Sequence, residues 1–324
     1  MSETFKLGVA FHSFTEEYCS CAWSFEDLME LTAYLGRGVE IVGPAHQRGF
    51  PHLTNDFERL FKSAVERFEL VPTCYGSYAD PFMLPDRNLS EDELVAYTLP
   101  QIDAAGRLGF PIVRLQYFVY PVIERLLPLA EKLGVKLGYE LHAPLTLEAE
   151  RTRRLVEQVK DLRSPCLGII PDCGIFGRSI PEFRIRAARA RGVAPELLEQ
   201  ALACWKAGME VGEARKRLLA DGLPDKQFDV LEPFWGCVGQ SDPRKLIEVM
   251  PHIIHLHGKF FSIVDGDEPD LLYEEVVTAL LDGGYRGWMS SEFEGARDET
   301  NSFLVLQEHQ HMIRRYIDDY RARA

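Results

Sequence analysis

The stretch KLGYELHAPLTLEAERTRRLVEQVKDLRSPCLGIIPDCG, residues 136–174, carries the pattern that decides the fold. It begins with a short apolar run, continues through a segment whose apolar residues recur every three or four positions, and ends in a second apolar run. The two runs predict strands over 136–142 and 167–174, and the segment between them predicts a helix. This order is typical of a parallel βα unit.

The same alternation recurs along the whole chain. Further apolar runs that predict strands lie at 6–12, 38–44, 69–76, 111–117, 253–260 and 287–294, with amphipathic helical segments between them. Eight such units predict an α/β fold, a single closed (β/α)8 TIM barrel domain over residues 1–324. An open doubly wound sheet is the alternative, but no G-x-G-x-x-G motif follows the first strand, which disfavours it.

One segment, at about 178–235, interrupts the alternation after the sixth predicted strand. It is rich in Arg and Ala and predicts an insertion of two or three helices. Loops that follow the strands of a TIM barrel form the rim that carries the active site. We interpret the insertion as a lid or as a docking surface for another chain, and a solvated helical decoration is the alternative.

The composition excludes several classes of partner. Of the 324 residues, 46% are hydrophobic and 27% are charged, and the formal net charge is −14. Such an acidic chain has no basic field for phosphates, so we expect no nucleic acid and no membrane partner. The start, MSETFKLGVAFHSF, lacks the pattern of a signal peptide, which predicts a cytoplasmic protein. The seven cysteines are scattered and are expected to be reduced thiols.

Polar side chains stand at the carboxyl ends of the last four predicted strands, where TIM barrels place functional groups. They are Glu140 and His142 on the fifth strand, Asp172 on the sixth, His255, His257 and Lys259 on the seventh, and Glu292 and Glu294 on the eighth. Three carboxylates and an imidazole that converged on one point would be unstable without a cation. Oxygen-rich donors favour a hard or borderline divalent ion, and we expect Mn²⁺, with Mg²⁺ or Co²⁺ as alternatives.

Two pairs within this set require a choice. His255 and His257 point to the same side of their strand, but His257 lies one step nearer the rim and is the better metal ligand. His255 is interpreted as an interior histidine. Periodicity does not decide between Glu292 and Glu294. Glu294 is interpreted as a group that hydrogen-bonds substrate.

The order of these residues resembles the xylose isomerase-like barrel family of sugar isomerases and epimerases. The resemblance extends over nearly the whole chain and rests on GVEIVGP at 38–44, HLHGK at 255–259 and WMSSEFEG at 288–295. It implies that the metal ligands are Glu140, Asp172, His257 and Glu292. Apurinic endonucleases and ketose 3-epimerases of this fold carry a histidine three residues after the aspartate of strand six. Ile175 stands there in this chain, which weakens both interpretations.

Within this family, the chain most resembles the α subunits of bacterial C-glycoside deglycosidases. The motifs that carry this resemblance are YELHAP at 139–144, PDCGIFGRSIPEFR at 171–184 and HLHGKF at 255–260, together with the long insertion. The resemblance implies a 3-oxo-glycoside substrate, a glucoside joined through carbon to an aromatic aglycone. It also implies a small β subunit in a hetero-oligomer.

A mechanism follows as a hypothesis. His142 removes the C2 proton, which the neighbouring ketone makes acidic, and Lys259 stabilises negative charge on oxygen. The aglycone then leaves C1 by β-elimination. Phe14, Trp23 and Tyr75 are expected to stack on the aglycone, with core packing as the alternative role for each. A metal-dependent sugar or inositol-derivative isomerase or epimerase is the alternative function, and a non-catalytic barrel that serves as an assembly partner is another.

Overall fold

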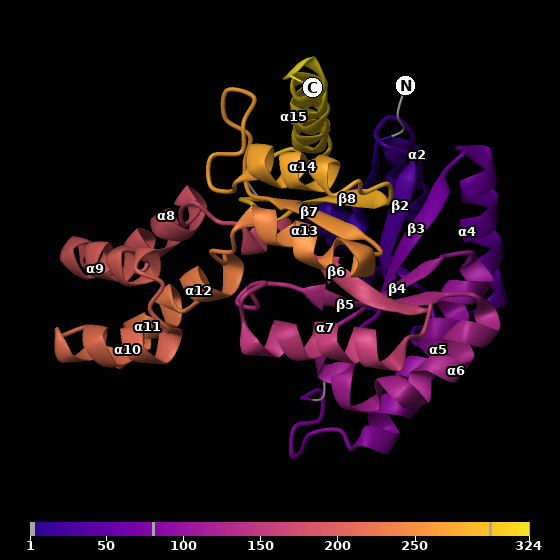
Figure 1. Cartoon of the computed structure of the whole chain (residues 1–324), viewed down its shortest axis with the longest axis horizontal. Coiled ribbons are helices and arrows are strands. Elements are labelled where there is room, and N and C mark those ends of the chain that lie inside the picture. The colour runs from indigo at the N-terminus through magenta and orange to yellow at the C-terminus, as the bar shows by residue number, and fades with distance from the viewer. Residues whose placement is uncertain (1–3, 80–81, 298–299, 324) are drawn as a thin grey trace.

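The computed structural model describes residues 4–79, 82–297 and 300–323, and its central feature is a sheet of eight parallel strands (Figure 1). The strands are β1 (Lys6–Ala10), β2 (Gly38–Val42), β3 (Val71–Gly76), β4 (Ile112–Leu115), β5 (Lys136–Leu141), β6 (Leu167–Pro171), β7 (Leu256–Phe260) and β8 (Trp288–Phe293). Their order is β6-β5-β4-β3-β2-β1-β8-β7. Isolated parallel bridges from Ile169 to Ile253 and from Asp172 to His257 join the two outer strands. The predicted TIM barrel is thereby confirmed.

Each strand is shorter than the apolar run that predicted it, and β6 shows why. It ends at Pro171, because the Asp172 side chain accepts a hydrogen bond of 2.6 Å from the backbone N–H of Gly174. This contact starts the 3-10 helix η3 (Cys173–Ile175). The ionisable side chains that follow the apolar runs therefore stand at the mouth of the barrel.

Helices cover the outside of the barrel and connect successive strands. The longer ones are α2 (Phe25–Ala33), α4 (Asn55–Arg67), α5 (Glu91–Leu108), α6 (Ile123–Leu133), α7 (Glu150–Leu162), α14 (Tyr273–Asp282) and α15 (Ser302–Arg323). The short ones are α1 (Thr15–Cys19), α3 (Gly43–His46), α13 (Leu246–Val249), η1 (Phe11–Phe14), η2 (Tyr117–Val122), η4 (Pro243–Lys245) and η5 (Met250–His252). Ser24 and Ser90 begin α2 and α5 with capping boxes, which satisfy backbone N–H groups of the first turn.

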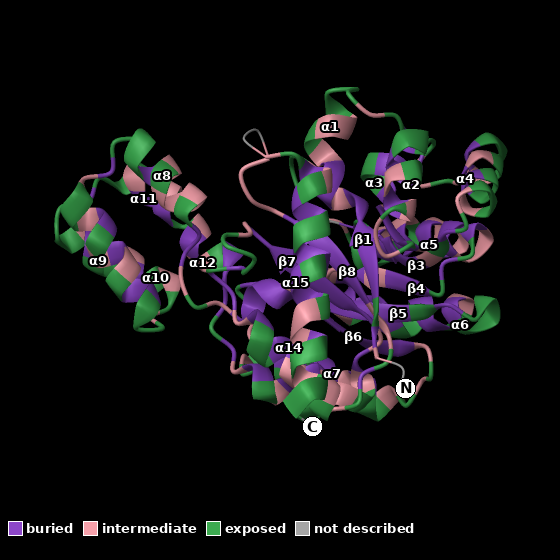
Figure 2. Cartoon of the chain, turned by 90° about the horizontal axis from the view of Figure 1, so that it is seen from above, coloured by how far each residue is buried: buried purple, intermediate pink, exposed green. Residues whose placement is uncertain are grey.

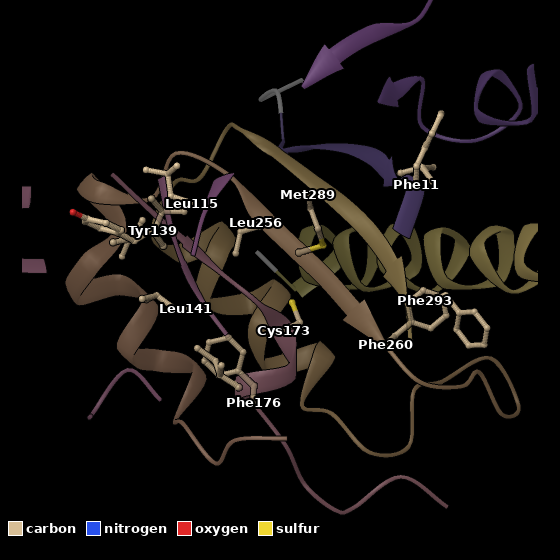
Figure 3. Packing of buried hydrophobic residues seen from close by; sticks show 14 of the residues in the cluster. Phe11, Leu115, Tyr139, Leu141, Cys173, Phe176, Leu256, Phe260, Met289 and Phe293 are labelled. Carbon is tan, nitrogen blue, oxygen red and sulfur yellow. The ribbon is translucent and has the colours of Figure 1, made fainter. Parts of the chain in front are cut away.

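Alternation along the strands separates the core from the site. Tyr139 and Leu141 of β5 belong to the apolar layer between strands and helices, which Figure 3 shows from close by, and the Tyr139 hydroxyl donates to Gln158 of α7. Glu140, between them, points into the barrel and reaches His257 of β7. In Figure 2 the strands are mostly buried, whereas the surrounding helices expose one face. The apolar layer thus carries most of the packing, while the polar groups share the barrel interior with a small apolar cluster of Cys74, Ile112 and Ile170.

The insertion contains five helices, more than the two or three expected. They are α8 (Glu182–Ala190), α9 (Pro195–Lys206), α10 (Val211–Ala220), α11 (Asp225–Leu231) and α12 (Pro233–Cys237). Gly192, Gly208 and Gly222 follow α8, α9 and α10 with positive φ angles of 80°, 68° and 99°, which divide the helical sequence into short pieces. The helices project to one side of the barrel in Figure 1.

Two short backbone segments attach the insertion to the barrel. Phe176 and Gln240 form an antiparallel bridge, and the N–H of Gly177 donates to the carbonyl of Gly239 at 2.7 Å. Trp205 and Phe228 are buried among the inserted helices and belong to an apolar cluster that is continuous with the core of the barrel. The chain therefore leaves and re-enters the barrel at adjacent points.

Two further observations concern membrane-spanning helices and the cysteines. Over the ranges that the structure describes, no helix combines the length and the apolar character needed to cross a membrane. All seven cysteines are free thiols, in agreement with the sequence-based expectation.

Candidate active site

A cavity of about 310 Å³ opens at the carboxyl ends of the strands. Its lining consists of His12, Val42, Ser77, Tyr78, Arg114, Gln116, Tyr117, Phe118, Glu140, His142, Glu292 and Glu294. One part of this wall is ionisable and another part is aromatic. The cavity therefore suits a ligand with a polar portion and a flat apolar portion.

The four predicted metal ligands lie together beneath this cavity. Nδ1 of His257 is 3.0 Å from Oε1 of Glu140 and 3.1 Å from Oε2 of Glu292, and Oδ2 of Asp172 lies 3.8 Å away. All four residues are buried. Three carboxylates thus face one ring nitrogen, which is an arrangement that a cation would stabilise.

The chemistry of this donor set fits a divalent cation. Oδ2 of Asp172 is buried without a hydrogen-bond partner among the described residues. Burial raises the pKa of Asp172 to about 6, even though the charge of Lys259 lowers it. A buried carboxylate oxygen without a hydrogen-bond partner, beside two more carboxylates and an imidazole, provides the ligands that a hard or borderline divalent ion prefers.

Glu40 of β2 holds the opposite edge of the His257 ring, and the sequence analysis did not identify it as a site residue. Its Oε1 lies 2.6 Å from Nε2 of His257, and its Oε2 lies 3.1 Å from Nε2 of His255. His255 Nε2 is also 3.0 Å from the Ser290 hydroxyl. Burial opposes protonation of His257, but the charges of Glu292 and Glu40 outweigh it and hold the pKa of the imidazole well above its usual range.

Arg114 of β4 was also not identified from the sequence. Its Nη1 donates to Glu140 at 2.6 Å, and its Nε donates to Glu40 at 3.2 Å. The guanidinium of Arg114 therefore bridges Glu140, a predicted metal ligand, and Glu40, which contacts Nε2 of His257. The bridge offsets part of the repulsion between these two buried acids.

His142 occupies the cavity wall as a neutral imidazole of defined tautomer. Its Nδ1 is 2.6 Å from the carbonyl oxygen of Ala143, which can only accept, so Nδ1 carries the hydrogen. Its Nε2 then has a lone pair, which accepts a hydrogen bond from Nζ of Lys259 at 2.6 Å. The basic nitrogen of His142 is therefore Nε2.

Lys259 and Glu294 continue this contact around the cavity. Nζ of Lys259 lies 2.7 Å from Oε2 of Glu294, and Oε1 of Glu294 lies 3.2 Å from Nε2 of His12. Burial opposes the charge of Lys259, but Asp172 and Glu294 outweigh it and raise the pKa of the amine. Lys259 is thus an ammonium group within the barrel.

The three aromatic residues predicted to contact an aglycone do not line this cavity. Phe14 and Tyr75 are fully buried in the core, Phe14 against Trp23 with ring centroids 5.7 Å apart. Tyr75 points away from the barrel interior, and its hydroxyl donates to Gln47 at 2.8 Å. That prediction does not fit the structure, because strand alternation places Tyr75 on the face that packs against helices.

Aromatic side chains from two other loops line the cavity instead. Tyr117 and Phe118 of η2 have ring centroids 4.2 Å apart, and Phe82 meets Phe118 edge-on at 5.7 Å. Tyr78 also lines the cavity. We refer to Tyr78, Tyr117 and Phe118 as the aromatic wall.

A signal in the sequence could have revealed the missed ionisable residues. His12 follows the first strand, Glu40 lies in the second and Arg114 lies in the fourth. All three stand at positions whose side chains point into the barrel. The rule that polar residues at strand ends are functional selects these three residues as well, when it is extended from strands five to eight to all eight strands.

We expect the Glu40→Gln substitution to weaken Mn²⁺ binding by about 10- to 100-fold, because an amide orients the His257 ring less strongly than a carboxylate. Isothermal titration of metal-free protein with Mn²⁺ measures the affinity, and thermal unfolding shows whether the fold is kept. Glu66→Gln, at an exposed position of α4, is the matched control. Equal Mn²⁺ affinities for the wild type and Glu40→Gln would contradict the assigned role of Glu40.

Comparison with known proteins places the chain among its relatives. No family model matches it. The 3'-dehydrocarminate deglycosidase alpha subunit of a Microbacterium species is 35% identical, over 98% of this chain and 97% of the relative. A C-glycoside deglycosidase alpha subunit of Arthrobacter globiformis is 34% identical, over 89% of this chain and 83% of the relative.

Solved structures agree with the fold. A D-allulose 3-epimerase from Methylomonas superposes with a TM-score of 0.58 at 11% identity, covering 97% of this chain and 98% of the other. A 3-keto-D-glucoside 4-epimerase from E. coli gives a TM-score of 0.55 at 11% identity, covering 96% and 100%. These likenesses show the barrel fold. The identities of 35% and 34% to full-length relatives show that the chain belongs to the C-glycoside deglycosidase alpha subunits.

Proposed function

We propose that this α subunit cleaves the carbon–carbon bond between a 3-oxo-glucose unit and an aromatic aglycone, with a divalent metal ion, Mn²⁺, at the cluster around His257. The observation that carries the proposal is His142 in the wall of the cavity above that cluster, with its Nδ1 directed at the carbonyl oxygen of Ala143. The lone pair on Nε2, once Lys259 releases it, is suited to removing a proton from carbon. The family of the chain supports the same reaction.

The residues would act as follows. A divalent cation held by Glu140, Asp172, His257 and Glu292 would stabilise negative charge on the ketone oxygen of the substrate. His142 takes the C2 proton on Nε2. The electron pair of the C2–H bond forms the C1=C2 double bond, and the bond from C1 to the aglycone breaks. The products are an unsaturated sugar ketone and the free aglycone, which takes up one proton.

Lys259 orients His142 before this step. An ammonium group has three donors, so Lys259 can retain Glu294 at 2.7 Å while it releases Nε2 of His142 to the substrate. Its positive charge also favours an oxyanion close to the cluster. Glu294, with its side chain 24% exposed, remains available to hydrogen-bond a sugar hydroxyl.

The aromatic wall would receive the aglycone. Tyr117 and Phe118 lie on the loop after β4, next to Arg114 and Glu140 in the lining of the cavity. Rings at this place can stack on or meet edge-on a flat ligand, with a contribution of about 0.5–1.5 kcal/mol for each pair. This assignment replaces Phe14, Trp23 and Tyr75 as the proposed aglycone contacts.

The direct test is mass spectrometry of the Mn²⁺-loaded protein, with its partner subunit, after incubation with a 3-oxo-C-glucoside. We expect free aglycone and an unsaturated sugar ketone, because elimination divides the carbon skeleton. His142→Ala should lower the turnover by about 10²- to 10⁴-fold while the bound metal is retained. Metal content, measured on the same sample, separates loss of the base from loss of the site.

Two results would count against this proposal. A product of unchanged total mass with a rearranged sugar would indicate an isomerase or epimerase, which uses the same type of metal site but keeps the carbon skeleton. Unchanged turnover by a metal-loaded His142→Ala variant would remove His142 as the base.

For the aromatic wall, we expect Tyr117→Ala to raise KM about 2- to 10-fold for substrates with an aromatic aglycone, because one ring contact is lost. KM for C2 hydrogen exchange of methyl 3-oxo-glucoside, which has no aglycone ring, should stay unchanged. Tyr120→Ala is the matched control, since Tyr120 lies on the same helix η2 but packs toward Tyr139 instead of lining the cavity. An equal rise in KM for both substrates would show a general disturbance of the site.

A partner subunit belongs to the same proposal. The relatives are named as alpha subunits, which implies a second subunit in those proteins. We propose that a small β subunit binds the inserted helices α8–α12, which project from the barrel (Figure 1). The same helices could instead serve as a lid over the substrate.

Deletion of residues 180–235, closed by a short glycine linker, tests the contact. The barrel should still fold, because the chain leaves and re-enters it at Gly177 and Gly239, whose backbones are hydrogen-bonded at 2.7 Å. We expect the deleted chain to lose the β subunit in size-exclusion chromatography with light scattering. Retention of a complex with the same stoichiometry would exclude the insertion as the principal interface.

A further inference from the structure

We propose that His12 is a second catalytic residue, which donates a proton to the aglycone carbon as the bond to C1 breaks. This inference rests on the proposed elimination and goes beyond it, because the elimination defines a base but leaves the source of the second proton open. A carbon leaving group needs that proton, since a carbanion is a poor leaving group in water.

The topology places His12 opposite His142. In the strand order of the barrel, β1 and β5 are separated by three strands on either side. His12 follows β1 and His142 follows β5, both at the carboxyl ends of their strands. Among the described residues that line the cavity, these are the two imidazoles. A sugar bound between them would meet one imidazole on each side.

Local contacts hold His12 in a donating position. Its Nε2 lies 3.2 Å from Oε1 of Glu294, and the Thr15 hydroxyl lies 3.5 Å from Nδ1. The His12 side chain is 36% exposed, so it remains accessible to a ligand in the cavity. The Glu294 carboxylate can only accept when ionised, and it therefore favours a hydrogen on Nε2.

The proposed step balances in protons and electrons. His142 gains the C2 proton, the C2–H electron pair becomes the C1=C2 bond, and the electron pair of the broken C1 bond passes to the aglycone carbon. That carbon takes the proton from Nε2 of His12, which begins the step as an imidazolium and ends it as a neutral imidazole with its hydrogen on Nδ1. One proton is taken up and one is given, so neither an oxidant nor a reductant is needed.

A chain of contacts joins the two imidazoles and can restore their protons. It runs from Nε2 of His142 to Nζ of Lys259 at 2.6 Å, on to Oε2 of Glu294 at 2.7 Å, and from Oε1 of Glu294 to Nε2 of His12 at 3.2 Å. Proton transfer along this chain would return the proton gained by His142 to His12. Each link is a direct contact between side chains.

The test separates the two proton transfers. His12→Gln and His12→Asn, in the Mn²⁺-loaded complex, are incubated in D2O with 3-oxo-C-glucosides, and NMR follows both aglycone release and deuterium at C2 of recovered substrate. We expect release to fall by about 10²- to 10⁴-fold, while C2 exchange stays within about threefold of the wild type. His311→Gln, at an exposed position of α15, is the control and should change neither.

A series of aglycones provides a second measurement. The defect of His12→Gln should shrink as the aglycone carbon becomes a better leaving group, because less proton donation is then required. A defect of constant size across the series of aglycones would overturn the inference. In the D2O experiment, unchanged aglycone release would also overturn it. So would a parallel loss of C2 exchange and aglycone release in both His12 variants. If the wild type itself exchanged C2 hydrogen without releasing aglycone, the proposed elimination would fail instead.

Discussion

The repulsion among buried carboxylates at the mouth of the barrel is the constraint on which the rest of the site depends. The buried acids that meet there are Glu40, Glu140, Asp172 and Glu292, and the partly buried Glu294 lies beside them, all on or directly after strands β2, β5, β6 and β8. Burial strengthens their repulsion, because the protein interior screens charge far less than water does. The cationic groups beside them are Arg114, His257 and Lys259. Five negative groups thus face three positive ones. A divalent cation that replaced the proton of its ligand His257 would raise the positive charge from three to four and would offset more of the repulsion.

The compensating groups are divided between two levels of the barrel. Below the cavity, Arg114 bridges Glu40 and Glu140, and Glu40 holds one edge of His257. At the level of the cavity, Lys259 joins His142 to Glu294. The lower level contains the predicted metal ligands, and the upper level contains the imidazole to which we assign proton removal. Both arise because inward-pointing residues two apart on a parallel strand lie one above the other.

Strand alternation also explains where the sequence analysis succeeded and where it did not. His257 was preferred over His255 as a metal ligand on its position along the strand, and in the structure His257 lies beside Glu140 and Glu292, whereas His255 contacts Glu40. The same alternation places Tyr75 outside the barrel, where its side chain packs in the core. Tyr117 could not be selected from the sequence, because it follows a strand of only four residues, and its orientation depends on the turn into η2.

By itself, the sequence determined the barrel, the position of the insertion and the ionisable residues at the ends of the last four strands. These features depend on local periodicity and on the order of βα units, both of which are readable along the chain. The tertiary structure decided the contacts across the barrel. Glu40 meets His257, and Arg114 bridges two acids, across strands far apart in sequence. His12 stands opposite His142 because closure of the barrel brings β1 and β5 face to face, and closure is a property of all eight strands together.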